Sequence, residues 1–364
     1  MFNGPLGLDR AEKPEKLDWR FVGASKWPAF ATSIADTVAT RTVTDTYTTK
    51  SGFPGSFAFI GGVLLPDGRV YCVPRNATEA RIYDPIGDTI TTPTGTFPTV
   101  GEKGGVLLPD GRVFIGPGTT AAATIYDPVA DTVTTPAGTY PGAGSKPIYI
   151  GGGLVLIPRT GVDTTGRIYN YLTDTLTTTT TLKGCTHGGV LLPDGRVFLL
   201  PRGGTTVAEI YDPPGDSVIA TSALFSGTYE SAILLPDGKV VCTPTFDGQT
   251  VAVYDPVSDT AAYSTTGLTD KVTGGSLMPD GRVFLPSRTP LVGGGNALIF
   301  DPSNLTLTAS SGGSAGAHAF CGAVTLLDGR VFCIPYRSTS SKIYGGGGGF
   351  DENVSLSAYY NHSS

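Results

Sequence analysis

The ten residues GGVLLPDGRV occur three times in the chain, at 61–70, 104–113 and 188–197. Near copies lie between and after them, and one turn aspartate marks each copy, at Asp67, Asp110, Asp194, Asp237, Asp280 and Asp328. The steps are 43, 84, 43, 43 and 48 residues, and the step of 84 spans a divergent copy, PIYIGGGLVLIPR at 147–159. The chain therefore holds seven copies, and such a fixed period is the signature of a repeat architecture.

Each copy predicts four short strands. An apolar run meets Pro-Asp-Gly, in which Pro sets φ at the first turn position and Gly supplies the positive φ of a bulged hairpin. A second apolar run follows, then a variable loop, a third run ending in Tyr-Asp-Pro, and a Thr-rich run headed by Asp or Asn. Runs of β-branched residues bounded by Pro, Gly and Asp are typical of strands. We therefore predict seven antiparallel units of four strands.

Composition favours an all-β fold. The 51 Gly and 28 Pro residues interrupt the chain too often for long helices, and no apolar stretch is long enough to predict membrane insertion. Four-stranded units repeated four to eight times close radially as the blades of a β-propeller. We predict a seven-bladed β-propeller over 44–345, an N-terminal arm at 1–43, and a Gly-rich linker and C-terminal tail at 346–364.

The two ends of the repeat region predict how the ring closes. The last copy breaks into GGGGG where its fourth strand is expected, while TDTYTTKSGFP at 44–54 matches the fourth strand ADTVTTPAGTYP at 130–141 and has no hairpin before it. Pairing of 44–54 with the last blade would remove two exposed sheet edges. The alternative is that ENVSLSAYY at 352–360 fills that place.

The Gly-Gly pair near the innermost strand, the Tyr-Asp-Pro third strand and the Asp-Thr fourth strand resemble the kelch and galactose-oxidase type of propeller repeat, over 44–345. The kelch pattern places its Gly pair after the second strand and a Trp in the fourth, and neither feature recurs here. The resemblance implies the fold and no inherited function.

Strand order predicts one uniform and one variable face. The Pro-Asp-Gly turns and the Asp-Pro turns share a face, and the connections of varied length on the other face are where binding is usually built. Cations recur in those connections, at Arg75, Arg159, Arg202, Arg288 and Arg337, with Lys103, Lys146 and Lys183 nearby. In a chain of net charge −6 such a basic ring would attract anionic groups. The alternative is a structural role bridging blades, and the overall acidity argues against nucleic acid.

No catalytic, metal or cofactor site is indicated, so we predict a protein that is not an enzyme and needs no cofactor. The three histidines and their neighbouring cysteines lack metal-ligand spacing: His187, His318, His362, Cys185 and Cys321. Ser314 in GGSAG matches a nucleophile elbow only by chance, because no strand-to-helix turn is expected there. If the propeller cleaved carbohydrate instead, Glu230 and Asp270 near the channel mouth would be the carboxylates to test.

Cys72, Cys242 and Cys333 share one second-strand position and are expected to be buried apolar substitutes. The chain shows neither a signal-peptide pattern nor a disulfide spacing, so we expect folding in a reducing cytoplasm.

The arm contains Trp19, Phe21 and Trp27, aromatic residues of the kind that anchor interfaces. They could equally pack the arm against a blade. The combination resembles accessory proteins of bacteriophage virions, such as tail, baseplate or fibre components. This resemblance implies a structural propeller docked by its arm onto other subunits of a multi-protein assembly in the virion, with its variable face turned to a host-surface ligand or anionic glycan. The alternatives are a soluble carbohydrate-binding or carbohydrate-active propeller and a cytoplasmic kelch-like adaptor.

Overall fold

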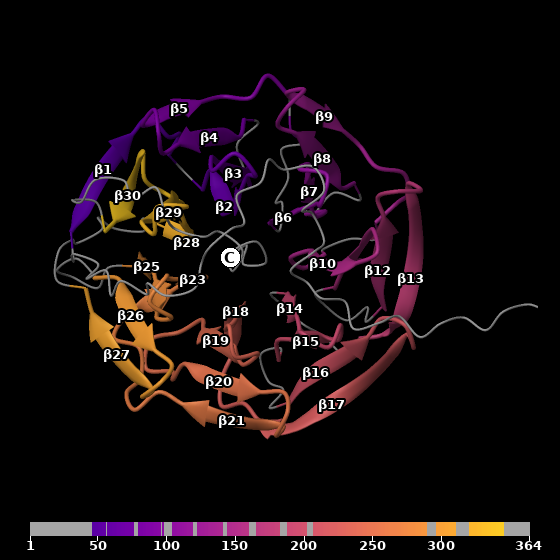
Figure 1. Ribbon diagram of the computed structural model, residues 1–364, viewed down its shortest axis with the longest axis vertical. Coiled ribbons are helices and arrows are strands. Elements are labelled where there is room, and N and C mark those ends of the chain that lie inside the picture. The colour runs from indigo at the N-terminus through magenta and orange to yellow at the C-terminus, as the bar shows by residue number, and fades with distance from the viewer. Residues whose placement is uncertain are drawn as a thin grey trace, which may run out of the picture. The chain divides into compact units, whose positions relative to one another are not determined.

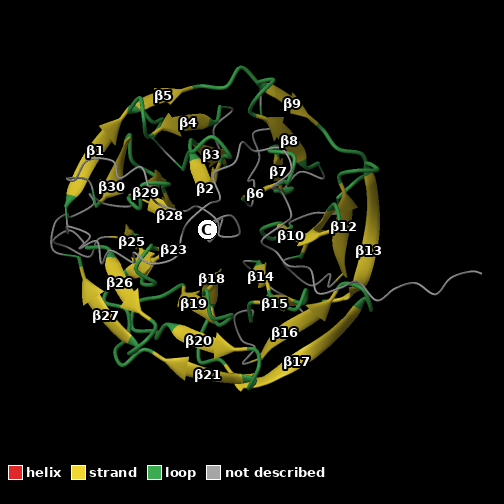
Figure 2. Ribbon diagram, in the orientation of Figure 1, coloured by secondary structure: helices red, strands yellow, loops and turns green. Residues whose placement is uncertain are grey.

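The computed structural model describes residues 46–55, 57–75, 79–95, 97, 104–118, 122–140, 144–159, 165–182, 188–201, 207–289, 296–310 and 320–345. All of them belong to one compact unit, Thr40–Ser364, and every regular element among them is a β-strand (Figure 2). The arm at 1–43 and the segment 346–364 lie outside the described residues. Within the described ranges no helix could span a bilayer.

Seven four-stranded antiparallel sheets form a ring (Figure 1). Blades 1 to 3 consist of β2 (Phe59–Leu64), β3 (Val70–Pro74), β4 (Arg81–Asp84) and β5 (Thr89–Thr91); β6 (Gly105–Leu107), β7 (Val113–Ile115), β8 (Thr124–Asp127) and β9 (Thr132–Thr134); and β10 (Ile148–Gly151), β11 (Leu154–Ile157), β12 (Thr165–Asn170) and β13 (Thr175–Thr181). Blades 4 and 5 consist of β14 (Gly189–Leu191), β15 (Val197–Leu199), β16 (Val207–Asp212) and β17 (Ser217–Leu224); and β18 (Tyr229–Leu234), β19 (Val240–Pro244), β20 (Ala252–Asp255) and β21 (Thr260–Tyr263). Blade 6 consists of β23 (Ser276–Leu277), β24 (Val283–Leu285), β26 (Leu298–Asp301) and β27 (Thr306–Ala309), with the extra pair β22 (Lys271–Val272) and β25 (Ser287–Thr289).

Blade 7 is completed by a strand from the other end of the repeat region. It contains β28 (Phe320–Thr325), β29 (Val331–Pro335) and β30 (Ser340–Tyr344), and β1 (Tyr47–Ser51) pairs antiparallel with β30 from Tyr47↔Tyr344 to Ser51↔Ser340. The predicted closure by 44–54 is therefore confirmed for Tyr47–Ser51.

The repeated hairpin turn has the geometry that its residues predict. Gly68 has a φ of 86° and donates its N–H to Leu65 O, and Leu65 N–H in turn donates to Arg69 O at 2.8 Å, which is a type I turn followed by a Gly bulge. The Asp67 carboxylate accepts from Arg69 N–H and forms an ion pair with its guanidinium. Turn and charge pair therefore occur together in every blade except the divergent third.

Neighbouring blades are joined by stacked aromatic rings. A Tyr on the third strand of one blade packs against a ring of the second strand of the preceding blade, with centroids 4.5–5.2 Å apart. The rings are tilted in Phe284–Tyr344 and stacked in Tyr71–Tyr126, Phe114–Tyr169, Phe198–Tyr254 and Phe332–Tyr83. The last of these joins blade 7 to blade 1. All these rings are buried, and such stacking adds to the stabilisation from apolar burial.

The same Tyr carries a polar contact at the rim of the ring. Tyr126 OH donates to Asp131 Oδ1 at 3.0 Å, and the other carboxylate oxygen, Oδ2, accepts from Thr94 N–H of the preceding blade at 3.0 Å. Asp174, Asp216 and Asp259 bind their own Tyr and the preceding blade in the same way. At the closure, Asp88 forms its ion pair with Lys50 of β1 at 2.9 Å.

We expect Asp131→Asn to show how much of the stability of this contact comes from the carboxylate charge and how much from its hydrogen bonds. Hydrogen bonds from Thr94 and from Tyr126 hold the pKa of Asp131 below its ordinary value. Its ionised form therefore stabilises the folded state above about pH 4, and that contribution is lost as the pH falls through the lower, folded-state pKa. Asp131 has a φ of 51°, which Asn tolerates, and Asn keeps an acceptor oxygen. The free energy of unfolding of the variant should therefore be lower by about 0.5–1 kcal/mol at pH 7, a value already reduced for solvent screening.

Urea denaturation between pH 7 and pH 3 measures the difference in free energy of unfolding between wild type and variant. This difference should become smaller as the wild-type carboxyl is protonated. Asp247→Asn, at an exposed carboxylate after β19, is the control and should change little. If Asp131→Asn lowers the free energy of unfolding as much at pH 3 as at pH 7, the carboxylate charge contributes nothing to stability.

Candidate functional site

The two ends of the blades differ as the sequence predicts. Because the strands of each blade are antiparallel and sequential, the Pro-Asp-Gly turns and the Asp-Pro turns lie together on one face, which we call the uniform face. The connections after the second and fourth strands lie on the opposite, variable face. Four of the five predicted arginines fall in described parts of the variable face: Arg75, Arg159, Arg288 and Arg337.

Three of these arginines gather where blades 6, 7 and 1 meet. Arg75 follows β3, and its Nη1 donates to the hydroxyl of Tyr336 at 2.5 Å. The guanidinium carbons of Arg75 and Arg288 each lie 5.4 Å from the centre of the Tyr336 ring. Arg75 and Arg288 are partly exposed, whereas Tyr336 is buried. Two cations therefore share one aromatic ring, an arrangement that keeps both charges close together at a blade junction.

A second ring extends this cluster. Phe57 packs edge-on against Tyr336 with centroids 4.9 Å apart, and the exposed Arg337 guanidinium lies 3.8 Å from the centre of the Phe57 ring. Phe57 has a φ of 59°, a left-handed conformation that is rare and strained for a bulky residue. Strain of this kind concentrates at binding sites, where the surrounding structure holds it in place. We call Phe57, Arg75, Arg288, Tyr336 and Arg337 the arginine–aromatic cluster.

At or just before the innermost strand of each blade, equivalent positions carry different chemical groups. Counting back seven residues from each turn Asp gives Ile60, Lys103, His187, Glu230, Thr273 and Cys321, and the register of β10 with β11 puts Ser145 in the same place in blade 3, with Lys146 next to it. Of these, the structure describes Ile60, Ser145, Glu230, Thr273 and Cys321. A position that is variable in chemistry on a repeated backbone is where ligand specificity can be built.

Charged and ionisable groups at this position and next to it influence one another and the arginines. Burial lowers the pKa of Lys146 to about 8, and the charge of Glu230 opposes that shift. Burial raises the pKa of the Cys321 thiol to about 12, while Arg75 and Arg288 pull it down and Glu230 pushes it up. Lys146, Glu230 and Cys321 therefore belong to the same electrostatic environment as the arginine–aromatic cluster. A protonated thiol of this kind is a poor nucleophile.

The remaining predicted site residues have other positions. Arg159 is partly buried and bridges antiparallel to Gly144. Asp270 is buried and accepts from Ser287 Oγ at 2.5 Å and from Lys271 N–H at 2.7 Å, which indicates a structural role in the extra β22–β25 pair. Outside the described residues lie Arg202, Lys103, Lys183, Trp19, Phe21, Trp27, Ser314, Cys185 and the three histidines.

Three of the cysteines lie where the alignment of the copies predicts them. Cys72, Cys242 and Cys333 are buried, as predicted for apolar substitutes. Among the described residues no group of three His, Cys, Asp or Glu side chains could hold a metal ion.

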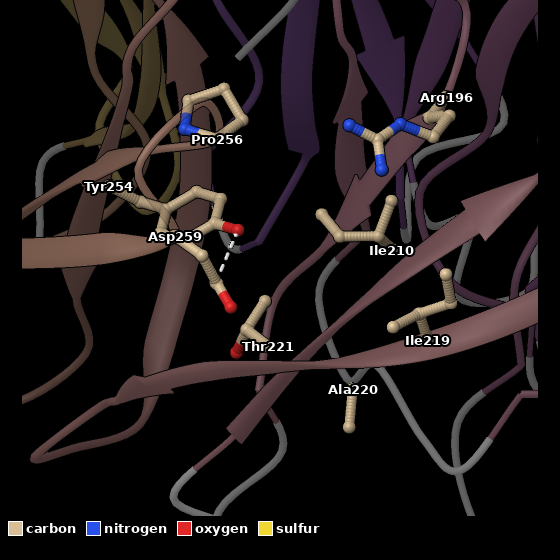
Figure 3. Close-up of a pocket in the computed structure, with 8 residues that line it drawn as sticks. All are labelled: Arg196, Ile210, Ile219, Ala220, Thr221, Tyr254, Pro256 and Asp259. Carbon is tan, nitrogen blue, oxygen red and sulfur yellow. Dashed lines mark hydrogen bonds between the residues drawn. The ribbon is translucent and has the colours of Figure 1, made fainter.

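A crevice of about 120 Å³ lies between blades 4 and 5, away from the variable face (Figure 3). Its polar groups serve the blade contact: Tyr254 OH donates to Asp259, which also accepts from Ser222 N–H, and Arg196 is paired with Asp194. It is therefore a seam of the ring and not a ligand site.

Sequence reasoning missed the two aromatic rings of the cluster. Phe57 precedes the innermost strand of blade 1 and Tyr336 follows the second strand of blade 7, so nothing in their spacing links them. The sequence did contain a signal for the position seven residues before the turn Asp. Aligning the copies on that Asp shows the change from Lys103 to Glu230 to Cys321.

No protein-family model matches the sequence, and no curated protein does either. Solved structures share the architecture. A streptogramin B lyase matches with a TM-score of 0.66 and 11% identity over 82% of this chain and 96% of its own. The virginiamycin B lyase of Staphylococcus aureus matches with 0.66 and 9% over 82% and 98%, and the WD40 propeller domain of Doa1 with 0.63 and 13% over 82% and 96%. At these identities the likeness shows the β-propeller fold alone.

We expect Glu230→Gln to lower the pKa of Lys146 further below about 8, because it removes the negative charge that favours the protonated amine. NMR titration of the chain after reductive ¹³C-methylation of its lysines measures this value. Lys239 is the control, since its pKa is raised by Asp237 on the uniform face and should not move. An unchanged Lys146 titration would mean that the two groups do not share an environment.

Proposed function

We propose that this protein is a non-enzymatic binding propeller that presents its variable face to an anionic ligand, most simply an acidic glycan of a host surface. The observation that carries the proposal is the arginine–aromatic cluster at the junction of blades 6, 7 and 1. Its strained Phe57 supports a binding role, because a purely structural packing contact needs no left-handed Phe.

The cluster offers the two contacts that an acidic sugar needs. Guanidinium groups recognise carboxylate and sulfate through paired hydrogen bonds. Aromatic rings bury the apolar face of a sugar ring, and Phe57 is partly exposed beside Arg337. Lys146, just before β10 in blade 3, adds a further cation. The propeller supplies the rigid frame that such a site requires.

We further propose that residues 1–43 dock the propeller onto other subunits of an assembly of the bacteriophage tail or fibre type, which would place the protein in the virion. The support is the sequence of the arm, with Trp19, Phe21 and Trp27 beside charged residues. Docking through the arm would leave the variable face available to the ligand.

Reversal of the cluster charges tests the ligand class. We expect Arg75→Glu with Arg288→Glu to weaken binding of carboxylate- or sulfate-bearing glycans by at least about tenfold on an array that pairs each acidic glycan with its neutral counterpart. Arg282→Glu, on the uniform face and paired with Asp280, is the matched control. If the double variant keeps both its glycan binding and its thermal stability, these arginines do not bind the ligand and the proposal is wrong.

Deletion of residues 1–43 tests the docking. The predicted outcome is a folded propeller with an unchanged melting temperature, because β1 and every blade are kept, that no longer co-purifies with the assembly. Glycan binding by the truncated protein should persist. Incorporation at the level of the full chain would contradict a role for the arm.

A further inference from the structure

The uniform face presents large apolar side chains to solvent at one repeated position. Ile86, Val129, Leu172 and Val257 are 78%, 95%, 67% and 95% exposed. Each is the second residue of the turn that joins the third and fourth strands of its blade. Blade 4 has the exposed Pro214 there and blade 6 has Ser303. Single exposed apolar residues are common on protein surfaces, but here one turn position repeats them around the ring.

The turn holds these side chains in a rigid setting. Asp84 Oδ1 accepts from the N–H groups of Ile86 and Gly87 at 2.9 and 3.2 Å. Asp127, Asn170 and Asp255 accept from the corresponding N–H groups at 2.9–3.3 Å. The two N–H groups of each turn are thus bonded by the turn's own Asp or Asn side chain, and the apolar side chain contributes nothing to that bonding. Little conformational entropy remains to be lost when such a residue is buried by a partner.

Comparison among the copies separates this position from its neighbour. At the position of Ile86 the residue is Ile, Val, Leu, Pro and Val in blades 1 to 5, so it stays apolar. The residue that follows it is Gly, Ala, Thr, Gly and Ser. Ser303 of blade 6 makes the same turn, since its N–H donates to Asp301 at 2.9 Å. Because a polar residue forms the turn equally well, its geometry does not explain the apolar ones.

The charge around these residues selects the kind of partner. The described turns between third and fourth strands carry ten carboxylates, at Asp84, Asp88, Asp127, Asp131, Asp174, Asp212, Asp216, Asp255, Asp259 and Asp301. The cations of the hairpin turns on the same face are each paired with their own Asp, at Arg69, Arg112, Arg196, Lys239, Arg282 and Arg330. An acidic rim of this kind repels the same face of a second copy and repels an anionic membrane.

We propose that the uniform face is a second docking surface, on which a basic protein surface bearing apolar pockets covers Ile86, Val129, Leu172 and Val257 while its cations meet the surrounding carboxylates. The apolar contacts supply binding energy in water, and the carboxylates supply orientation and attraction. This surface is independent of the glycan ligand proposed for the variable face.

The test compares the full chain with the variant Ile86→Ser, Val129→Ser, Leu172→Ser and Val257→Ser, which copies the residue that blade 6 already uses. The probe is a helical peptide built from leucine and lysine, with its binding followed by fluorescence anisotropy. We expect the variant to bind at least about tenfold more weakly at unchanged melting temperature and with unchanged glycan binding. Ile219→Ser with Leu224→Ser, two exposed apolar residues of β17 outside these turns, is the control and should bind as the wild type does.

Each other outcome overturns the proposal. Equal binding of the peptide by wild type and variant would mean that only charge is sensed. Self-association in sedimentation equilibrium that the variant abolishes would identify a second copy as the occupant. Flotation of the wild type, and not of the variant, with phosphatidylglycerol vesicles would identify a membrane. Should the fourfold variant fail to fold, the four single variants give the same comparison one turn at a time.

Discussion

The contact between the Tyr of one blade and the blade before it is the interaction on which the rest of the structure depends. In the buried part of the junction the ring of Tyr126 stacks on Tyr71, and at the rim its hydroxyl orients Asp131 to accept from Thr94 of the preceding blade. One side chain therefore links the apolar core between two sheets to a hydrogen bond that spans them. A ring of seven separate sheets has no single core, so its stability depends on such junctions.

The closing junction uses different residues for the same purpose. Tyr83 stacks on Phe332 of blade 7, and its partner Asp88 pairs with Lys50, which β1 brings from before the first blade. The same junction holds Phe57 and the three arginines on the variable face. The place where the repeat region closes on itself is thus also the place where these arginines and aromatic rings gather, since its blade combines strands from the two ends of that region.

The two faces differ in how much their residues can vary, and this difference follows from the repeat. The turns of the uniform face form ion pairs and hydrogen bonds within themselves, so they tolerate little change, and exposed apolar residues can persist there without affecting the turn. Connections on the variable face do not have to match one another, because each joins different strands. This is why Glu230 and Cys321 can occupy equivalent places on one backbone, with Lys146 next to the corresponding place in blade 3.

The repeated Pro-Asp-Gly and Tyr-Asp-Pro segments were sufficient by themselves to predict seven four-stranded blades, the closing strand near Tyr47 and the two faces, because turn chemistry and strand periodicity are local properties written into each copy. The burial of Cys72, Cys242 and Cys333 followed from the same alignment. Only the tertiary structure decided that Arg75, Arg288 and Arg337 meet around Tyr336 and Phe57, and that Asp270 is turned inward to Ser287. Those contacts join residues far apart in sequence, and their geometry depends on how the blades pack around the axis, which no local pattern encodes.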